Sequence, residues 1–285
     1  MQLSVVICAY NEQAHLAEQL DAVLAQQWEG EWEVVVVDNR STDATAAIVV
    51  ERAKRDPRLR LVHAVERAGQ SYSMNVGVDA TSSPWIAFCD ADDIVDDHWL
   101  ACIADGLSEH EVVTGPHELD LLNPRWLADS RGRSIEEPVG SFFGIFPCIR
   151  GAGWAIRRTT WDSVGGMNES FHAGQDIEYS FRCWNAGYEI VGLPGALVHY
   201  RYRQSPRALW RQGLAYGSNR PRIVKLLRDA GAERPPRFAG WKPWAFLLLR
   251  LPSLTHKEGR AVWGWVAGNR MGQVLGSVRE RVIML

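Results

Sequence analysis

The stretch "EVVVVDNRSTD", residues 33–43, places four consecutive valines before a run of polar and charged side chains. A continuous β-branched run of this kind is typical of a parallel strand that is covered on both faces. A second short apolar run, Ser4–Ala9, comes before it. Between the two runs, apolar residues recur at helical spacing: Leu16, Leu20, Val23 and Leu24. The order strand, helix, strand predicts an α/β domain with a parallel sheet.

The same alternation continues to about residue 110. We expect helices at Ala44–Lys54 and Met74–Ala80, and strands at Leu59–Ala64 and Trp85–Cys89. In a doubly wound sheet of this type, ligands bind at the carboxyl ends of the strands. That rule places three polar segments at one cleft: Tyr10–Glu12, Asp38–Asp43 and Asp90–Asp93.

The pattern becomes less regular in the second half of the chain. Residues 115–150 are rich in turn dipeptides and predict irregular structure or a long loop. Order returns at Gly151–Arg157, followed by a helix at Asp176–Ala186 and strands at Tyr188–Val191 and Ala196–Tyr200. From Trp210 onward the sequence predicts helices, with turns at Arg234–Pro236 and Leu251–Pro252.

Charge is distributed unevenly along the 285 residues. Residues 1–200 hold 14 Lys and Arg against 30 Asp and Glu, whereas residues 201–285 hold 17 against 4, and the net charge is −3. A basic tail of this kind meets phosphate on a nucleic acid or on an anionic membrane, or else forms a solvated helical face.

The segment "WAFLLLRLPSL", Trp244–Leu254, is the most apolar part of this tail. It is too short to span a bilayer, which takes about 20 apolar residues. Several tryptophans lie among Arg and Lys nearby and favour an interfacial helix: Trp241, Trp244, Trp263 and Trp265. The alternative is a helical cap that packs on the main domain.

Cysteine usage and the N-terminal residues indicate the compartment. The five cysteines are widely spaced and contain no C-x-x-C pair, and residues 1–8 do not resemble an export signal. We therefore expect reduced thiols in a cytoplasmic protein, located at the inner face of the plasma membrane if the basic tail binds lipid.

The stretch "FCDADD", residues 88–93, ends an apolar strand in three carboxylates. Asp90 and Asp92 form a D-x-D pair that presents hard oxygen ligands to a divalent cation, which also binds phosphate oxygens. A solvated acidic turn is the alternative. We expect Asp93 to cap a helix, since Asp is common at helix starts.

Neither a G-x-G-x-x-G nor a P-loop motif is present, so a dinucleotide-binding fold and a P-loop fold are not supported. Six other segments carry a resemblance to a known family. They are "SVVICAYNE", "VVVVDNRSTDAT", "RAGQSYSMNVGVDAT", "IAFCDADD", "VGGMNESF" and "GQDIEYSFRCWNAGY". In their order and spacing the chain resembles family-2 glycosyltransferases with the GT-A fold, over roughly residues 1–205. The resemblance implies an inverting, metal-dependent enzyme that moves a sugar from a nucleotide diphosphate donor, with UDP favoured over GDP, onto an acceptor hydroxyl. We expect one transfer per acceptor, because the sequence lacks the Q-x-x-R-W motif and the spanning helices of processive synthases.

The resemblance also assigns donor-side residues. Asp38 matches the position that hydrogen-bonds the nucleotide base, and Ala9, Tyr10 and Glu12 belong to the loop that holds base and ribose. The segment that passes over the nucleotide supplies Arg67, Gly69 and Asn75. Asp92 is expected to bind Mg²⁺ or Mn²⁺ directly, while Asp90, with Ala91 beside it, is directed at the ribose or the metal.

On the acceptor side, Asp176 matches the aspartate that serves as catalytic base, although an N-cap of its helix is the other interpretation. The family usually has Glu where this chain has Gln175, which puts donor or acceptor contacts in doubt. Glu178 is the rival base. Trp154 either stacks on the acceptor sugar or packs in the core.

Three residues of the segment "LVHYRYR" complete the expected site. His199 matches a position at which related enzymes supply a third metal ligand. Arg201 and Arg203 either clamp the diphosphate or lie solvated on a loop.

The sequence thus predicts a GT-A catalytic domain over residues 1–205, with a donor half (1–110) and an acceptor half (111–205), and a basic helical extension over 206–285. The alternatives are a sugar-nucleotide nucleotidyltransferase and a nucleic-acid-binding protein that uses the basic tail. Both are less favoured, because the first loop lacks glycine and a cation and no nucleic-acid-binding motif is present. The sequence does not identify the acceptor, and a lipid-linked molecule is one candidate. Whether the chain forms a homodimer is also left open.

Overall fold

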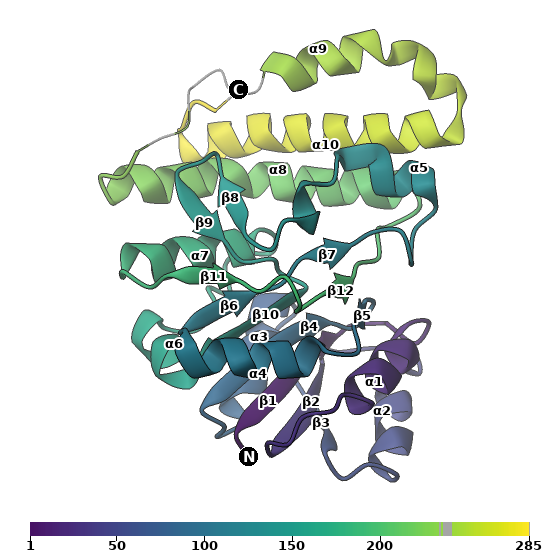
Figure 1. The fold of residues 1–285 in the computed structure, drawn as a ribbon. Coiled ribbons are helices and arrows are strands. Elements are labelled where there is room, and N and C mark those ends of the chain that lie inside the picture. The colour runs from purple at the N-terminus through teal and green to yellow at the C-terminus, as the bar shows by residue number, and fades with distance from the viewer. Residues whose placement is uncertain (234, 236–240, 285) are drawn as a thin grey trace.

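The computed structural model describes residues 1–233, 235 and 241–284. Its centre is a seven-stranded sheet in the order β11-β6-β10-β4-β1-β2-β3 (Figure 1). The strands are β1 Leu3–Ala9, β2 Trp32–Asp38, β3 Leu59–His63, β4 Trp85–Asp90, β6 Val112–Thr114, β10 Gly153–Arg157 and β11 Ile190–Gly192. β1 pairs in parallel with β2 and β4, whereas β10 pairs antiparallel with β4 and β6. The expected α/β fold with a mostly parallel sheet is confirmed.

Helices cover both faces of this sheet. On one face lie α1 Leu16–Leu24, α2 Thr45–Ala53 and α4 Trp99–Glu109, and on the other lie α3 Gln70–Asp79, α6 Arg158–Val164 and α7 Gln175–Asn185. The valines of β2 explain why: Val34 and Val36 pack in the first core, and Val35 and Val37 in the second. Successive side chains of a strand point to opposite faces, so a run of four valines requires two apolar layers.

Short elements cross the carboxyl ends of the central strands. A small sheet joins β5 Ile94–Val95, β12 Val198–His199 and β7 His117–Glu118. The segment expected to be irregular holds α5 Arg125–Ala128, two 3₁₀ turns, η1 Asp129–Arg131 and η2 Ser134–Glu136, and a hairpin of β8 Gly140–Phe142 with β9 Phe146–Cys148. α3 begins at Gln70, four residues before the expected start. Its N-cap residue is Gly69, which has no side chain to form a capping hydrogen bond.

The C-terminal part is helical. The long helices α8 Pro206–Asp229 and α10 Lys257–Glu280 lie side by side above the sheet domain, and α9 Trp241–Leu249 with η3 Leu251–Thr255 lies beyond them (Figure 1). Ile223 and Leu227 of α8 pack with the β8–β9 hairpin and with α7. These two long helices therefore form a cap packed on the rest of the chain. The turn expected at Arg234–Pro236 includes residues 234 and 236, which lie outside the described residues.

The approach of α8 to α10 depends on glycine. A Cβ atom on Gly272 of α10 would lie 2.2 Å from the carbonyl oxygen of Leu214 in α8, whereas one on Gly264 would lie 3.6 Å from that of Pro206. The helix backbones are thus in direct contact near Gly272 and slightly apart near Gly264. Within the described ranges, no helix is long and apolar enough to cross a membrane.

Candidate active site

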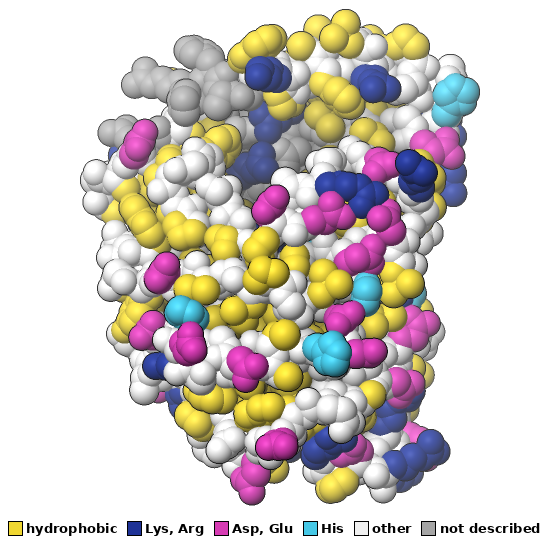
Figure 2. All heavy atoms as spheres, viewed as in Figure 1, with side chains coloured by type: hydrophobic (Ala, Val, Ile, Leu, Met, Phe, Trp, Pro, Cys, Tyr) yellow, Lys and Arg dark blue, Asp and Glu magenta, His cyan; other side chains and the backbone are white. Residues whose placement is uncertain are grey.

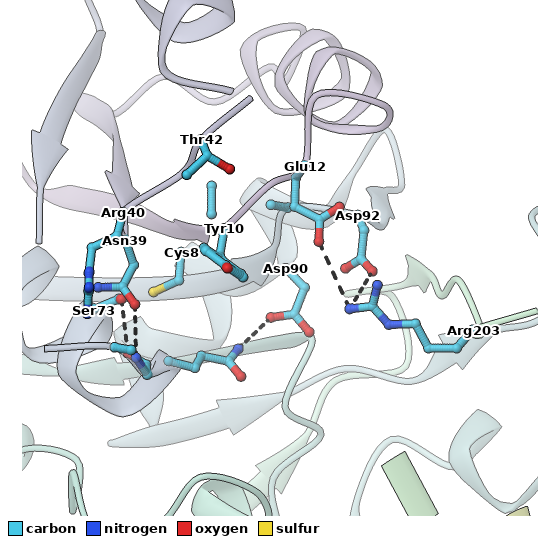
Figure 3. Close-up of a pocket in the computed structure, with 15 residues that line it drawn as sticks. Cys8, Tyr10, Glu12, Asn39, Arg40, Thr42, Ser73, Asp90, Asp92 and Arg203 are labelled. Atoms are coloured by element: carbon cyan, nitrogen blue, oxygen red, sulfur yellow. Dashed lines mark hydrogen bonds and ion pairs between the residues drawn. The ribbon is translucent and has the colours of Figure 1, made fainter. Parts of the chain in front are cut away.

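A cleft of about 570 Å³ opens at the carboxyl ends of β1, β2 and β4. It is lined by residues from all three polar segments that the sequence placed together, including Ala9, Tyr10, Glu12, Asn39, Asp90, Ala91 and Asp92 (Figure 3). Its size is that of a typical small-molecule site. The topology of the sheet, which brings the ends of neighbouring parallel strands to one edge, accounts for this arrangement.

Three carboxylates meet where β4 ends. One oxygen atom each of Asp90, Asp92 and Asp93 lies within 4.8 Å of the others. Burial, and then the negative charges of Asp92 and Asp176, raise the pKa of Asp90 to about 8. Carboxylates that repel one another in a partly buried cleft favour a divalent cation, and oxygen ligands of this kind suit Mg²⁺ or Mn²⁺. The donor set therefore fits the expected metal.

The expectation that Asp93 caps a helix is wrong. Its side chain is buried beneath the cleft, and its Oδ1 accepts a hydrogen bond of 2.7 Å from the backbone N–H of Arg201. Its Oδ2 is buried without a hydrogen-bond partner in the described part of the chain. Asp93 thus anchors the turn that presents Asp92, and it remains within reach of a cation.

The side chain of Gln19 supports the same turn from below. Its Nε2 donates to the backbone oxygen of Asp90 at 2.8 Å, and its Oε1 accepts from the backbone N–H of Val95 at 3.1 Å. The sequence offered no signal for this role, because a glutamine in an amphipathic helix is commonly an exposed residue.

The two arginines of the "LVHYRYR" segment differ in position. Arg203 lines the cleft, with its Nη2 3.5 Å from Asp92 Oδ2 and 4.0 Å from Glu12 Oε1 (Figure 3). Arg201 instead donates from its Nε to the backbone oxygen of Asp92 at 2.8 Å and pairs with Glu18 at 2.9 Å. The proposed diphosphate clamp is therefore wrong for Arg201 and remains a prediction for Arg203.

Glu12 is the fourth carboxyl group of the cleft. Burial, and next the charge of Asp92, raise its pKa to about 7, although Arg203 acts in the opposite direction. A cation bound between these groups would favour the ionised form of all of them.

Asn39 lines the cleft directly after the end of β2. Its Nδ2 donates to the backbone oxygens of Ala64 and Arg67 at 2.6 and 2.7 Å, and its Oδ1 accepts from the N–H of Gly69 at 2.9 Å. Gly69 has a φ of 138°, which favours glycine. This network, which sequence reasoning missed, fixes the loop that ends at Gly69 over the cleft.

Asp38 ends β2 directly behind that loop. Its Oδ2 lies 3.4 Å from Nδ1 of His63, while its Oδ1 is buried without a partner in the described ranges. Unlike Asn39, Asp38 does not line the cleft. A buried acceptor without a donor is a natural partner for an N–H group of a ligand.

Two residues expected over the nucleotide point elsewhere. Arg67 forms an ion pair with Glu169 on the surface. Asn75 donates to the backbone oxygen of Met167 at 3.0 Å and accepts from its N–H at 2.7 Å. Both join the segment 67–75 to residues 167–169, and neither lines the cleft, so the geometry does not support their assignment to donor binding.

A second cavity, of about 410 Å³, adjoins the cleft and shares Gln70 and Asp90 with it. Asp176, in the first turn of α7, lines this cavity. Burial raises the pKa of Asp176, against the effect of backbone N–H groups and of Arg150. A Cβ atom on Gly151 would lie 3.2 Å from Asp176 Oδ2, so Gly151 leaves space at the carboxylate. The N-cap of α7 is Gly174, which removes the capping interpretation of Asp176.

A pair of glutamines connects the two cavities. Gln175 donates from its Nε2 to Oε1 of Gln70 at 2.9 Å, and Gln70 donates from its Nε2 to Oδ1 of Asp90 at 2.9 Å. The carboxylate cluster is thus hydrogen-bonded, through two neutral amides, to the start of the helix that carries Asp176.

Three further predicted site residues lie outside both cavities. Trp154 is 1% exposed and stacks on Phe88, so its acceptor-binding role is wrong. Glu178 is 2% exposed and pairs with Arg182 at 3.0 Å, so it is not a rival base. His199 accepts or donates at Nδ1 to Glu118 at 2.8 Å and does not belong to the acidic cluster, so the third metal ligand is also wrong.

The second cavity also contains residues that sequence reasoning missed. They come from the irregular segment, from the link between β12 and α8, and from the C-terminal helices: Arg131, Arg150, Tyr202, Tyr216, Arg220 and Trp265. The basic charge of residues 201–285 was the only signal, and it was interpreted as a surface feature.

Comparisons with known proteins agree with this geometry. A sequence model described as Glycosyl transferase family 2 matches residues 4–158, and one described as Glycosyl transferase family group 2 matches residues 85–266. A beta-monoglucosyldiacylglycerol synthase of Nostoc sp. is 26% identical over 220 residues, which are 74% of this chain and 47% of that protein. An uncharacterized glycosyltransferase of Haemophilus influenzae is 30% identical over 112 residues, or 39% of this chain and 34% of that protein. The chain thus spans less than half the length of these two curated relatives.

Solved structures show a similar fold. A mannosyltransferase from Pyrobaculum calidifontis, in complex with GDP-Man and Mn²⁺, has a TM-score of 0.68 at 20% identity, with 96% of this chain and 86% of that chain covered. Glucosyl-3-phosphoglycerate synthase from Mycobacterium tuberculosis, in complex with Mn²⁺, UDP and phosphoglyceric acid, has a TM-score of 0.57 at 19% identity, with 81% and 79% covered.

Proposed function

The chain belongs to glycosyl transferase family 2 and has the GT-A fold, and from this premise we propose that it transfers a sugar from a nucleotide diphosphate donor to an acceptor hydroxyl with inversion. One observation carries the proposal: a carboxylate cluster suited to a cation lies in one cavity, and a buried carboxylate lies in the adjoining one. The first suits a diphosphate leaving group, and the second suits an acceptor that must lose a proton.

On the donor side, Asp92 and Asp90 would hold Mg²⁺ or Mn²⁺, with Asp93 next to them. When bound, the cation neutralises charge that develops on the leaving diphosphate. Arg203 supplies a further positive charge at the same end of the cleft. Glu12 lies beside Arg203, and Ala9 and Tyr10 line the cleft as well. The orphaned Oδ1 of Asp38 is the acceptor proposed for an N–H group of the base. The preference for UDP over GDP rests on the resemblance to the family alone.

On the acceptor side, Asp176 accepts the proton of the acceptor hydroxyl. The hydroxyl oxygen forms the new bond to the anomeric carbon, and the nucleoside diphosphate leaves with the electron pair of the broken C–O bond. The raised pKa of Asp176 makes the carboxylate a better base than an exposed aspartate. Gln175 is not a candidate base, because its neutral amide does not ionise; its Nε2 holds Gln70 instead.

The extension over residues 206–285 has a separate role in this proposal. Large apolar side chains are exposed on α9 and just beyond it: Trp241, Trp244, Leu248, Leu249 and Leu251. Figure 2 shows hydrophobic and basic side chains at the top of the view, where Figure 1 places α9. Apolar side chains among Lys and Arg are typical of a helix that lies in the surface of an anionic membrane. We propose such a contact, at the inner face of the plasma membrane.

A thermal-shift panel tests the function. UDP-sugars, GDP-sugars, free nucleoside diphosphates and nucleoside triphosphates are added with and without Mn²⁺. A nucleotide sugar present at 100 times its Kd stabilises the folded protein by about 2.7 kcal/mol. We expect such a shift for one class of nucleotide sugar, dependent on Mn²⁺. Stabilisation by triphosphates together with sugar phosphates, and not by nucleotide sugars, would instead indicate a nucleotidyltransferase.

A further inference from the structure

Three arginines line the second cavity together with Asp176: Arg131 of η1, Arg150 ahead of β10, and Arg220 of α8. None of them forms an ion pair with a carboxylate within residues 1–233, 235 and 241–284. Arg150 is held by backbone oxygens, those of Glu137 at 3.1 Å and Ser134 at 2.5 Å. A cavity that concentrates unpaired guanidinium groups favours an anionic ligand.

Arg131 lies between two aromatic rings. Its guanidinium carbon is 3.9 Å from the ring centroid of Tyr202 and 4.0 Å from that of Trp265. Stacking satisfies the two faces of the planar group, but its N–H groups donate within the plane. Two of its nitrogens, Nε and Nη2, are buried without an acceptor in the described part of the chain. Unsatisfied donors on a buried cation are costly unless a ligand supplies the acceptor.

Arg220 faces the same cavity from the cap. Its Nη1 donates to Oδ1 of Asn269 at 3.2 Å, and Arg270 donates to the same oxygen from its Nη2 at 2.9 Å. One neutral amide is thus shared by two cations. Burial, and then the positive charge of Arg270, lower the pKa of Arg220 to about 10.

The carboxylates of the cavity do not balance these charges. Two line it, Asp176 and Asp90. Asp90 belongs to the acidic cluster, and Arg150 is close enough to Asp176 to act against the rise of its pKa. Arg131 and Arg220 are left without a compensating charge. The two positive charges match that of a phosphate group, which is about −1.5 to −2 at neutral pH. A phosphate group also offers three acceptor oxygens to the N–H groups of the two guanidinium side chains.

We propose that the acceptor carries a phosphate group, bound by Arg131 and Arg220, while its hydroxyl reaches Asp176. The inference rests on the proposed function, because it names the acceptor class of that same site. It also assigns a task to the cap: α8 and α10 supply Arg220 and Trp265, so they are part of the acceptor site.

Calorimetric titration with small probes tests the site without turnover. Glycerol 1-phosphate, inorganic phosphate, acetate and glycerol are titrated in EDTA, which removes the cation that would draw phosphate to the donor cleft. Glycerol 1-phosphate and inorganic phosphate distinguish an ester from the free anion. We expect both phosphates to bind, and acetate and glycerol to bind more weakly or not at all.

The variants are Arg131→Met and Arg220→Met, each with a lysine counterpart in case the methionine variant does not fold. Loss of a charge-assisted pair should weaken phosphate binding about tenfold or more. The matched controls are Arg125→Met, an exposed arginine of α5, and Arg203→Met in the donor cleft, and both should bind phosphate like the unaltered protein.

Unchanged affinity in the Arg131 and Arg220 variants, no phosphate binding at all, or acetate binding as tight as that of phosphate would overturn the proposal. So would a loss of phosphate binding confined to Arg203→Met. The proposed function fails separately: if no nucleotide sugar stabilises the protein while phosphate still binds at Arg131 and Arg220, the site stands and the transferase assignment does not.

Discussion

Replacement of Gly272 by alanine tests whether direct backbone contact holds the cap together. The added Cβ would lie 2.2 Å from the carbonyl oxygen of Leu214 and 2.8 Å from the backbone nitrogen of Ser218. Ordinary van der Waals contact begins at 3.4 Å. The helices α8 and α10 must therefore separate locally by about 1 Å. The atoms that move apart lose up to about half of the dispersion energy of their contacts.

The expected change in stability combines two opposing effects. Overpacking of this kind costs about 1–3 kcal/mol. Alanine, however, favours a helix over glycine by about 1 kcal/mol. We therefore expect Gly272→Ala to lower the free energy of unfolding by about 1–2 kcal/mol, since the backbone atoms that the Cβ meets cannot rotate away.

Gly264→Ala is the matched control, because it lies on the same helix and its Cβ would meet only Pro206 O at 3.6 Å. Without a clash, only the gain in helix propensity remains, so this variant should be more stable by up to about 1 kcal/mol. Urea denaturation followed by tryptophan fluorescence measures both. If the two variants change stability in the same direction and by the same amount, steric contact between the helices does not decide their packing.

Three further outcomes are expected. Asp176→Asn should lower the rate of sugar transfer by a factor of about 10² or more while donor binding persists. In the unaltered protein, burial raises the pKa of Asp176. The transfer rate should therefore fall as the pH drops through that pKa, which lies above the ordinary aspartate value near 3.9. Asp92→Ala should abolish the Mn²⁺ dependence of nucleotide binding in calorimetry, and persistence of that dependence would locate the cation elsewhere. Leu248→Ser with Leu249→Ser should weaken binding to anionic liposomes in a flotation assay, whereas Val65→Ser, also at an exposed apolar residue, should not.

The sheet and the donor cleft could be predicted because their signals are local. Four valines in a row define a strand with two apolar faces, and the rule for parallel sheets places the residues that follow β1, β2 and β4 at one edge. Tyr10, Glu12, Asp90 and Asp92 were therefore found from the sequence. Asp176 was singled out in a different way, through the resemblance of its motif to the family, and the structure places it in the adjoining cavity.

The failures concern side-chain direction and long-range packing. Trp154 and Glu178 lie close in sequence to residues that line the second cavity, but Trp154 packs in the core and Glu178 pairs with Arg182. No local pattern reveals which face of a short strand or helix meets a cavity. Arg131 and Arg220 line one cavity only because the C-terminal helices pack on the segment that contains η1, which is distant from them in sequence.

The glutamine pair has a consequence for how the cleft can vary among related chains. Gln175 stands where the family usually has glutamate, and its amide donates to Gln70, which in turn donates to Asp90. An ionised glutamate at 175 could not donate, and it would add a further negative charge near Asp90 and Asp176. Positions 70 and 175 should therefore change together. In a relative with glutamate at position 175, we expect a lysine or arginine at position 70. This covariation can be sought in sequences alone.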